Sequence, residues 1–527
     1  MAFVSFKFLF FVVAVTLVYF LTPKRFRWLV LLAASYGFYW LNSRVLILVL
    51  FGTTLVTFLF GLWLDRNRRR IKTPPAELGK EEKKAYKEAV KKRGKRILTL
   101  GILADLGVLL FLKYYNFFGA NANAALGRFG VNLPVLHLLL PLGISFYTLQ
   151  ALAYLIDVNR GKIEADRNLL RFMLFLSFFP QIVQGPIARH SQLAEQLYTG
   201  HDFDYRRLCF GAQLMLWGGM KKLILADRIA IPAAYLFDHY TQFHGPAVFF
   251  AAALYGLQVY ADFSGGMDIA RGIAQIFGIE LELNFRQPYF SHSIEEFWRR
   301  WHITLGSWMR DYIFYPLSLS KGFSKLGKQS RRVFGAFVGN RLPAFLSMFI
   351  VYFLVGFWHG AEWKYIAYGV WNGVIIMSSL LLPNVYAGMR SFLRIDENSW
   401  SWQGFQILRS FYLCSLGRLF SRAGDVRAAW AMMRSTFDRW YDLSFLVDGT
   451  LKRTGLNTAG WFVCLAAAVV LFGVDVLHEK DVRIRECIAE QNVLFRWAIY
   501  LLAIVLLAVF GMYGPMIDAS SFIYEQF

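Results

Sequence analysis

Charged side chains are scarce in this chain of 527 residues. Asp, Glu, Lys and Arg make up 17% of it, against about 25% in an ordinary soluble domain. Hydrophobic residues make up 57%, where about 45–50% is usual. A surface that faces water on all sides is excluded, because so few charged groups cannot cover it. The excess of apolar surface is therefore expected to face lipid.

Cysteine is also rare, and its spacing excludes the common structural uses of the thiol. The four cysteines lie far apart without a Cys-x-x-Cys pair, at Cys209, Cys414, Cys464 and Cys487. Such spacing predicts neither a zinc site nor a disulfide framework. The motifs of serine hydrolases, zinc peptidases and P-loop proteins are missing as well. We expect no metal site and no bound cofactor.

Long apolar runs are the dominant feature of the sequence. A helix that crosses a bilayer needs about 20 apolar residues, and shorter runs are typical of re-entrant or interfacial helices. The first run has no basic segment before it and no small-residue cleavage site, which favours a retained span over a signal peptide. The runs occupy residues 3–21, 28–40, 46–64, 97–118, 135–156, 169–183, 208–229, 246–260, 344–358, 363–382, 405–420, 461–476 and 494–510.

These runs predict an all-α, polytopic membrane protein with about eleven spans and several re-entrant or interfacial helices. The runs never stop for long enough to separate domains, so we expect one membrane domain over residues 1–527. Within it, residues 1–134 hold N-terminal spans, 135–383 the core and 384–527 the C-terminal helices.

The formal net charge of +22 would suggest a nucleic-acid partner in a soluble protein. In a membrane protein it has another cause, because basic residues crowd the cytoplasmic loops. The two most basic regions are 65–96 and 286–341. We therefore expect both regions in the cytoplasm, the N-terminus outside, and no nucleic-acid partner.

Polar residues inside a bilayer are costly, so each is a candidate for function. Histidine is the first to consider, because neutral imidazole is cheap to bury and can act as a base near pH 7. Seven of the nine histidines lie in loops or near the ends of apolar runs, where structural or solvated roles are expected: His137, His190, His201, His239, His244, His292 and His478.

His359 differs, because it ends the apolar run 345–358 and begins a turn at 359–362. At ~1.5 Å per residue, a helix would carry it ~24 Å from the basic loop, deep in the bilayer or near its far face. A turn at that depth is expected to line a cavity. Gly356 and Gly360 would allow close approach of the backbones. Catalysis and a structural histidine held by a neighbouring helix both fit this position.

His302 lies in a stretch where aromatic and apolar residues recur at helical spacing, which predicts one helix with a single aromatic stripe. The residues of this stripe are Trp298, Trp301, Leu305, Trp308 and Tyr312. One interpretation is an interfacial helix with a tryptophan belt and basic residues that reach the headgroups. The other is a re-entrant helix whose Arg299 and Arg300 meet a phosphate-bearing donor while His302 faces a tunnel.

Two acids, Asp262 and Asp268, flank the segment Phe-Ser-Gly-Gly-Met inside apolar sequence. Acids beside paired glycines predict a broken helix that lines a cavity. We expect these carboxylates to hold arginine or backbone groups rather than to react.

Several motifs in series closely resemble the membrane-bound O-acyltransferase (MBOAT) family, on its bacterial alginate O-acetylation branch. Teichoic acid D-alanylation proteins form a related branch. The resemblance begins near residue 141 and includes Lys-Lys at 221–222. The most specific motifs are Tyr-Ala-Asp-Phe-Ser-Gly at 260–265, Asn-Phe at 284–285, Pro-Tyr at 288–289, Phe-Trp-Arg-Arg-Trp-His at 297–302, Arg-Asp-Tyr at 310–312 and Phe-Trp-His-Gly at 357–360.

The resemblance implies a fold built around a central funnel and tunnel, with His359 as the catalytic base and His302 along the cytosolic approach. It implies acetyl-CoA or an acyl carrier thioester as donor. The partners that it implies are the lipid bilayer, a cytosolic acyl donor protein, and an extracellular polysaccharide or SGNH-type transferase as acceptor. Tetrahedral acyl transfer also needs oxyanion donors, which the sequence does not identify. Candidates for the site and the donor tunnel are Arg299, Arg300, Trp301, Asp262, Ser264, Trp358 and Asp311.

Two alternatives remain open at the level of sequence. D-alanyl transfer to teichoic acid would use a carrier protein on the cytosolic face in place of acetyl-CoA. Asn is usual in that branch where Arg299 stands, which favours acetyl transfer. A transporter without chemistry would also explain broken helices and buried acids. The expected location is a bacterial plasma membrane, in which the protein is multi-pass.

Overall fold

The computed structural model describes residues 3–130 and 132–513. Within these ranges the chain forms 24 α-helices, and its only β-type pairing is an isolated bridge between Phe285 and Trp301. The expected all-α class is confirmed.

Six helical stretches in the described ranges are long and apolar enough to cross a membrane: Lys24–Lys72, Lys80–Phe129, Pro246–Ile276, Lys321–His359, Thr458–Glu479 and Val493–Phe510. A seventh is possible if α17 (Trp363–Leu381) and α18 (Pro383–Phe392), bent by 73°, form one broken span. The shorter apolar helix α1 (Phe6–Leu21) adds to these. The chain is a multi-pass membrane protein, and the count of about eleven spans stays a prediction.

Contacts divide the described chain into two compact units. Unit 1 comprises residues 1–212 and 270–282, and unit 2 comprises residues 213–269 and 283–527. Helices α10 (Tyr205–Gly219) and α12 (Pro246–Ile276) each run through both. The single domain and its internal boundaries therefore stay predictions, and each unit is described separately.

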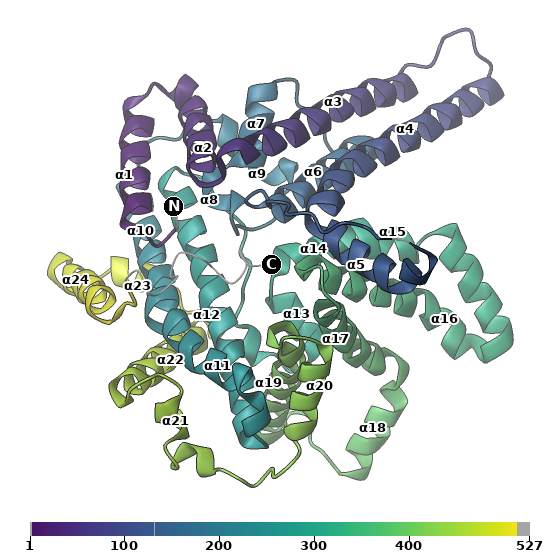
Figure 1. Ribbon diagram of the computed structural model, residues 1–527. Helices are drawn as coiled ribbons and strands as arrows, with labels where there is room; N and C mark the ends of the chain where they lie inside the picture. The colour runs from purple at the N-terminus through teal and green to yellow at the C-terminus, as the bar shows by residue number, and fades with distance from the viewer. Residues whose placement is uncertain (1–2, 131, 514–527) are drawn as a thin grey trace. The chain divides into compact units, whose positions relative to one another are not determined.

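Unit 1 is built around two long helices, α3 (Ile47–Lys72) and α4 (Lys80–Leu109), which lie side by side (Figure 1). Their partner is α6 (Ile144–Arg160), whose Tyr154 ring fills the space left by Gly61. A buried hydrogen bond of 3.1 Å from Thr57 to Asp105 also joins α3 to α4. The other helices that lie wholly in this unit are α1, α2 (Arg27–Ser43), α5 (Tyr115–Leu126), α7 (Leu169–Ser177), α8 (Phe179–Ile182) and α9 (His190–Tyr198).

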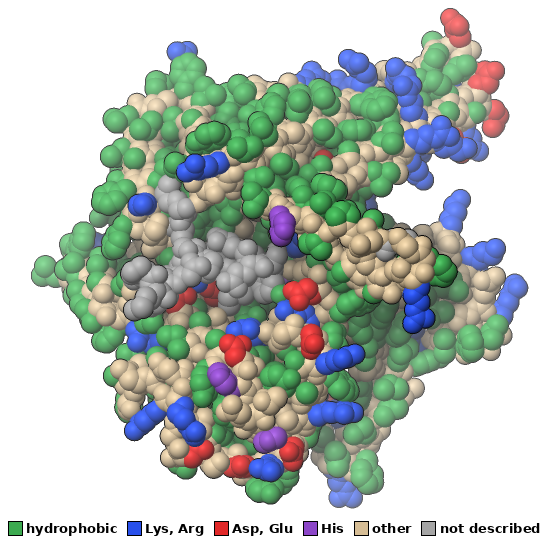
Figure 2. Space-filling view, in the orientation of Figure 1, with side chains coloured by type: hydrophobic (Ala, Val, Ile, Leu, Met, Phe, Trp, Pro, Cys, Tyr) green, Lys and Arg blue, Asp and Glu red, His purple; other side chains and the backbone are tan. Residues whose placement is uncertain are grey.

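The basic region 65–96 forms the joined ends of α3 and α4. Figure 2 shows Lys and Arg side chains gathered there, with acidic side chains at the turn. Glu82 accepts a hydrogen bond from the backbone of Gly79 at 2.8 Å, which caps α4 at its start. The interleaved Lys and Glu residues thus continue the helix beyond its apolar part.

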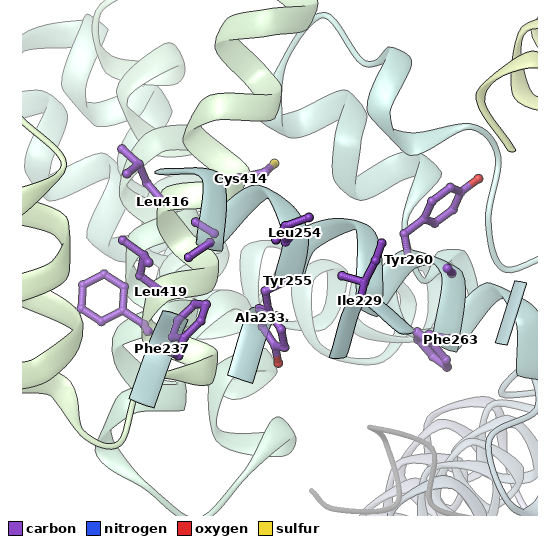
Figure 3. Packing of buried hydrophobic residues seen from close by; sticks show 14 of the residues in the cluster. Ile229, Ala233, Phe237, Leu254, Tyr255, Tyr260, Phe263, Cys414, Leu416 and Leu419 are labelled. Atoms are coloured by element: carbon purple, nitrogen blue, oxygen red, sulfur yellow. The ribbon is translucent and has the colours of Figure 1, made fainter. Parts of the chain in front are cut away.

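Unit 2 has a core formed by three helices that are distant in sequence. Side chains of α11 (Asp227–Asp238), α12 and α19 (Trp400–Arg422) meet in it, as Figure 3 shows for Phe237, Tyr255 and Leu419. All three side chains are at most 4% exposed. Around them lie α13 (Ile294–Arg300), α14 (Ile303–Met309), α15 (Tyr315–Ser318), α16 (Lys321–His359), α17, α18, α20 (Val426–Ser435), α21 (Thr450–Arg453), α22 (Thr458–Glu479), α23 (Ile484–Ala489) and α24 (Val493–Phe510).

Helices α16 and α17 form a tight hairpin whose turn follows His359. Glycines allow the close approach, because a Cβ at Gly356 would overlap the carbonyl oxygen of Tyr365. A Cβ at Gly369 would likewise overlap the carbonyl oxygen of Tyr352. The turn predicted from the sequence is confirmed, and it places His359 at the C-terminal end of α16, a helix that is kinked at Gly335 where φ is 80°.

Candidate active site

His359 is the last residue of α16, and its side chain lines a small cavity in unit 2. The cavity has a volume of about 40 Å³, enough for a few water molecules or a small acyl group. Most of its wall is aromatic, with a single cationic side chain. The residues that line it are Tyr255, Val259, Trp301, His359, Tyr365, Tyr368, Arg418 and Ser421.

His302 lies at a break between α13 and α14 and has a left-handed backbone with φ of 47°. Such a conformation is uncommon for a residue other than glycine, so its surroundings must hold it in place. Asn284 does so. Its backbone oxygen accepts from the N–H of Ile303 at 3.0 Å, and its side-chain oxygen accepts from the N–H of Thr304 at 2.9 Å. Asn284 therefore caps α14 from a distant part of the chain.

The prediction of one continuous helix through this stretch is wrong. Periodicity indicated a single aromatic stripe, but Trp301 is extended, pairs with Phe285 and separates two short helices. The cap that Asn284 provides is a tertiary interaction, so the local pattern does not contain it. The break turns the His302 side chain into the protein interior, where it is 1% exposed.

The rings of His302 and His359 both pack against Trp358. The centroid of Trp358 lies 5.7 Å from His302 and 5.2 Å from His359. Nδ1 of His302 is 3.2 Å from Nδ2 of Asn284. Burial, together with the nearby His359, lowers the pKa of His302 well below its ordinary value. His302 is therefore neutral at physiological pH, and its ring is fixed between Trp358 and Phe263.

Asp262 and Ser264 lie elsewhere in unit 2, against the π-helical turn Met220–Ala226. Nζ of Lys222 is 2.6 Å from Asp262, and Nζ of Lys221 donates to Ser264 at 2.9 Å. The predicted break in the helix here is wrong, because α12 is continuous through this segment. Gly265 instead lets α12 approach the backbone of Gly218 closely. Both acids form ion pairs with lysines, Asp262 with Lys222 and Asp268 with Lys221, each at 2.6 Å.

The arginine pair is held by carboxylates. Arg299 is exposed and pairs with Glu295 at 3.0 Å. Arg300 pairs with both Glu296 and Glu479 at 2.7 Å. Asp311 in turn pairs with its neighbour Arg310 at 3.0 Å. Of the candidates from the sequence, the structure thus brings His302, His359, Trp301 and Trp358 together, while Arg299, Arg300, Asp311, Asp262 and Ser264 lie outside the lining of the cavity.

Sequence reasoning missed five polar residues of the cavity wall: Tyr255, Tyr365, Tyr368, Arg418 and Ser421. Tyr255 and Tyr368 lie within apolar helices, where the tyrosines resemble ordinary core residues. The signal that was available for Arg418 is a charge inside the apolar run 405–420, which it shares with Arg409, because charges in such a run are costly in a membrane protein.

The site contains two histidines of unlike burial at an aromatic cavity in a multi-pass membrane protein. Imidazole at the edge of such a cavity can take a proton from a hydroxyl group and return it to a leaving group. Among the described residues that line the cavity, Ser421 is the only serine or cysteine, and its hydroxyl donates to the backbone oxygen of Arg418 at 2.9 Å. Such an arrangement is typical of an enzyme site in a multi-pass membrane protein.

The chain belongs to the membrane-bound O-acyltransferase family. The family model for MBOAT matches residues 163–421, a range that includes both histidines and the whole cavity wall. The protein is therefore an acyltransferase.

Three relatives show how similar chains are named. The chain is 34% identical to a "probable alginate O-acetylase AlgI" of Azotobacter vinelandii, over 80% of this chain and 74% of that protein. It is 31% identical to a peptidoglycan O-acetyltransferase of Helicobacter pylori, over 64% of each chain. It is 29% identical to a teichoic acid D-alanyltransferase of Streptococcus thermophilus, over 44% of this chain and 55% of that protein.

Proposed function

We propose that this protein transfers an acetyl group from cytosolic acetyl-CoA to a hydroxyl group outside the cell. The acceptor is an extracellular polysaccharide or an SGNH-type partner transferase, and the site of action is a bacterial plasma membrane. The observation that carries the proposal is the position of His359, which ends an apolar helix and lines the aromatic cavity.

His359 acts as the general base in this proposal. Its imidazole takes the proton of the acceptor hydroxyl while the oxygen attacks the carbonyl carbon of the thioester. The resulting tetrahedral intermediate collapses, the C–S bond breaks, and the imidazolium returns the proton to the departing thiolate. The products are an acetyl ester and a free thiol, so no covalent enzyme intermediate is needed.

His302 has a positioning role. Its ring is buried between Phe263 and Trp358, and its lowered pKa keeps it neutral. Trp358 in turn packs against His359. His302 therefore supports the orientation of the base through Trp358, and a second positive charge beside His359 is avoided.

The choice of acetyl over D-alanyl rests on the names of the relatives. The alginate O-acetylase matches much more of this chain than the D-alanyltransferase does. D-alanyl transfer to teichoic acid is the second candidate, since a relative of that name shares nearly half of the chain. It would replace acetyl-CoA with an aminoacyl carrier protein.

The first test is the amount of base-labile acetate on the envelope polysaccharide of cells with His359→Ala. We expect the acetate to fall to background, because the base for hydroxyl activation is removed. His239→Ala is the matched control, since His239 is exposed and bonds to the backbone oxygen of Tyr235 at the end of α11. Protein levels in the membrane are equalised by immunoblot.

The other results of this test lead to different conclusions. Unchanged acetate in His359→Ala cells would contradict the role of His359. Loss of ester-linked D-alanine in place of acetate would support the second candidate. If purified wild-type protein leaves thioesters intact while a solute still crosses the membrane, the protein is a transporter and the proposal is wrong.

A further inference from the structure

Arg418 is a charged side chain in an apolar interior. It lies on α19 and is 3% exposed. Gly256 of α12 makes room for it, because a Cβ there would lie 3.0 Å from Nη1 of Arg418. Burial of a guanidinium is costly, and arginine does not lose its charge in proteins. A chain that keeps a charge here needs a compensating interaction.

The described residues supply that interaction only in part. Nη1 and Nη2 of Arg418 are buried and have no hydrogen-bond acceptor within the described chain. No carboxylate of residues 3–130 or 132–513 forms an ion pair with it. Its contacts are aromatic, with the rings of Tyr289, Phe297 and Trp301 centred 5.2–5.6 Å from the guanidinium carbon. The faces of these rings attract a cation, but they provide no acceptor for the N–H groups of Arg418, which lie in the plane of the guanidinium.

The same side chain lines the cavity into which His359 faces. Arg418 is thus a fixed cation with unused N–H groups, enclosed by aromatic rings and beside the proposed general base. This arrangement is preorganised to bind an anion. In acyl transfer the charge that develops is the oxygen of the tetrahedral intermediate, and enzymes place hydrogen-bond donors at that oxygen. The low polarity of the surroundings strengthens the attraction.

We propose that Arg418 is the oxyanion donor of the reaction, an inference that rests on the proposed acyl transfer. When the acceptor oxygen forms its bond to the carbonyl carbon, the C=O π electrons move to the carbonyl oxygen. Arg418 donates N–H groups to that oxyanion while His359 holds the proton of the acceptor. As the C=O bond forms again, the C–S bond breaks and the thiolate receives the proton from His359.

The test compares Arg418→Met with wild type in inverted membrane vesicles, which contain the native acceptor and expose the cytosolic face. Acetyl-CoA is added outside, and thiol release is followed at several acetyl-CoA concentrations. Loss of one oxyanion donor is expected to lower kcat about 100-fold or more. The KM for acetyl-CoA should stay within about twofold, because the interaction forms only in the transition state.

Two further variants separate chemistry from packing. Arg418→Lys keeps a cation with fewer donors in a different geometry, so its kcat should lie between wild type and Arg418→Met. Arg409→Met is the matched control, since Arg409 is on the same helix and donates to the backbone oxygen of His292 at 2.8 Å, outside the cavity. Its kcat should stay within about threefold of wild type.

The Tm of Arg418→Met separates the proposed role from a structural one, because the loss of a structural residue should lower the Tm. Methionine in place of an incompletely satisfied buried charge is expected to keep or raise the Tm of the purified protein. A lowered Tm with kcat reduced only in proportion to the loss of folded protein would overturn the proposal. So would wild-type kcat in Arg418→Met, or a loss seen only as a raised KM.

Failure of the acyltransfer proposal has a different signature. If wild-type vesicles release no thiol, or His359→Ala releases it at the wild-type rate, the proposed function is wrong and the role of Arg418 falls with it. If wild type is active, His359→Ala is inactive and Arg418→Met is fully active, only the role of Arg418 is wrong.

Discussion

His302 and His359 share one site, but the chain holds them differently. His302 is 1% exposed and fixed at a strained backbone position by the cap from Asn284. His359 lies at the end of a helix and is partly exposed to the cavity. Pairs of titratable groups in unlike surroundings take unlike roles. The more exposed histidine is the one that can reach a substrate.

The lowered pKa of His302 predicts a loss of stability in acid. In the unfolded chain this histidine takes up a proton below its ordinary value of 6.5, whereas burial and the nearby His359 keep the folded form neutral. Stability from this group is thus fully present above pH 6.5 and falls as the pH falls. The free energy of unfolding should fall by about 1.4 kcal/mol for each pH unit below that value.

Thermal unfolding of purified wild type and His302→Gln, at about pH 7.5 and about pH 5.5, measures this effect. The decrease in stability with acid should be smaller in the variant, because glutamine does not titrate. His239→Gln serves as the control, since that side chain is exposed and should give the wild-type difference. An equal acid response in wild type and His302→Gln would show that His302 is protonated in the folded protein.

At the scale of elements, the α16–α17 hairpin is the part of the site that the sequence predicted best. The hairpin follows from local features of the sequence. These are an apolar run that ends in a histidine, a short polar turn, and small residues beside it. The break at His302 depends on Asn284, and the position of Arg418 depends on the packing of α12 against α19. Those are tertiary interactions, which periodicity in a single segment does not contain.

The hairpin predicts a sensitive site at Gly356. Alanine there would force α16 and α17 apart, because its Cβ would overlap the carbonyl oxygen of Tyr365. We expect Gly356→Ala to cost about 1–3 kcal/mol of stability, as overpacking typically does. The rate of acyl transfer per folded protein should also fall, because the shift moves His359 relative to the opposite wall of the cavity.

The measurement for Gly356→Ala is Tm together with thiol release per folded protein. Gly388→Ala in α18 is the control, since a Cβ at that position meets nothing within 4 Å. It should be neutral or slightly stabilising, because alanine favours a helix more than glycine does. Wild-type Tm and activity in Gly356→Ala would mean that the two helices can separate without cost.

At the scale of the whole molecule, charge rather than packing determines the orientation in the membrane. Six or seven helical stretches are apolar enough to supply spans, and the two basic regions overlap the ends of three of them. Basic loops stay in the cytoplasm during insertion. Since the proposed donor is cytosolic, the region 286–341, which includes the start of α16, should lie on the side from which the thioester enters.

Single cysteines at Lys87 and Lys328, one in each basic region, test this orientation. Both side chains are exposed, and the exposed Cys487 is first replaced by serine to remove the background. A maleimide that does not cross membranes should label both positions in inverted vesicles and neither in intact cells. Labelling of Lys328→Cys in intact cells would place the approach to His359 outside. A cytosolic thioester could then not reach the base along this region, and the direction of transfer would have to be reversed.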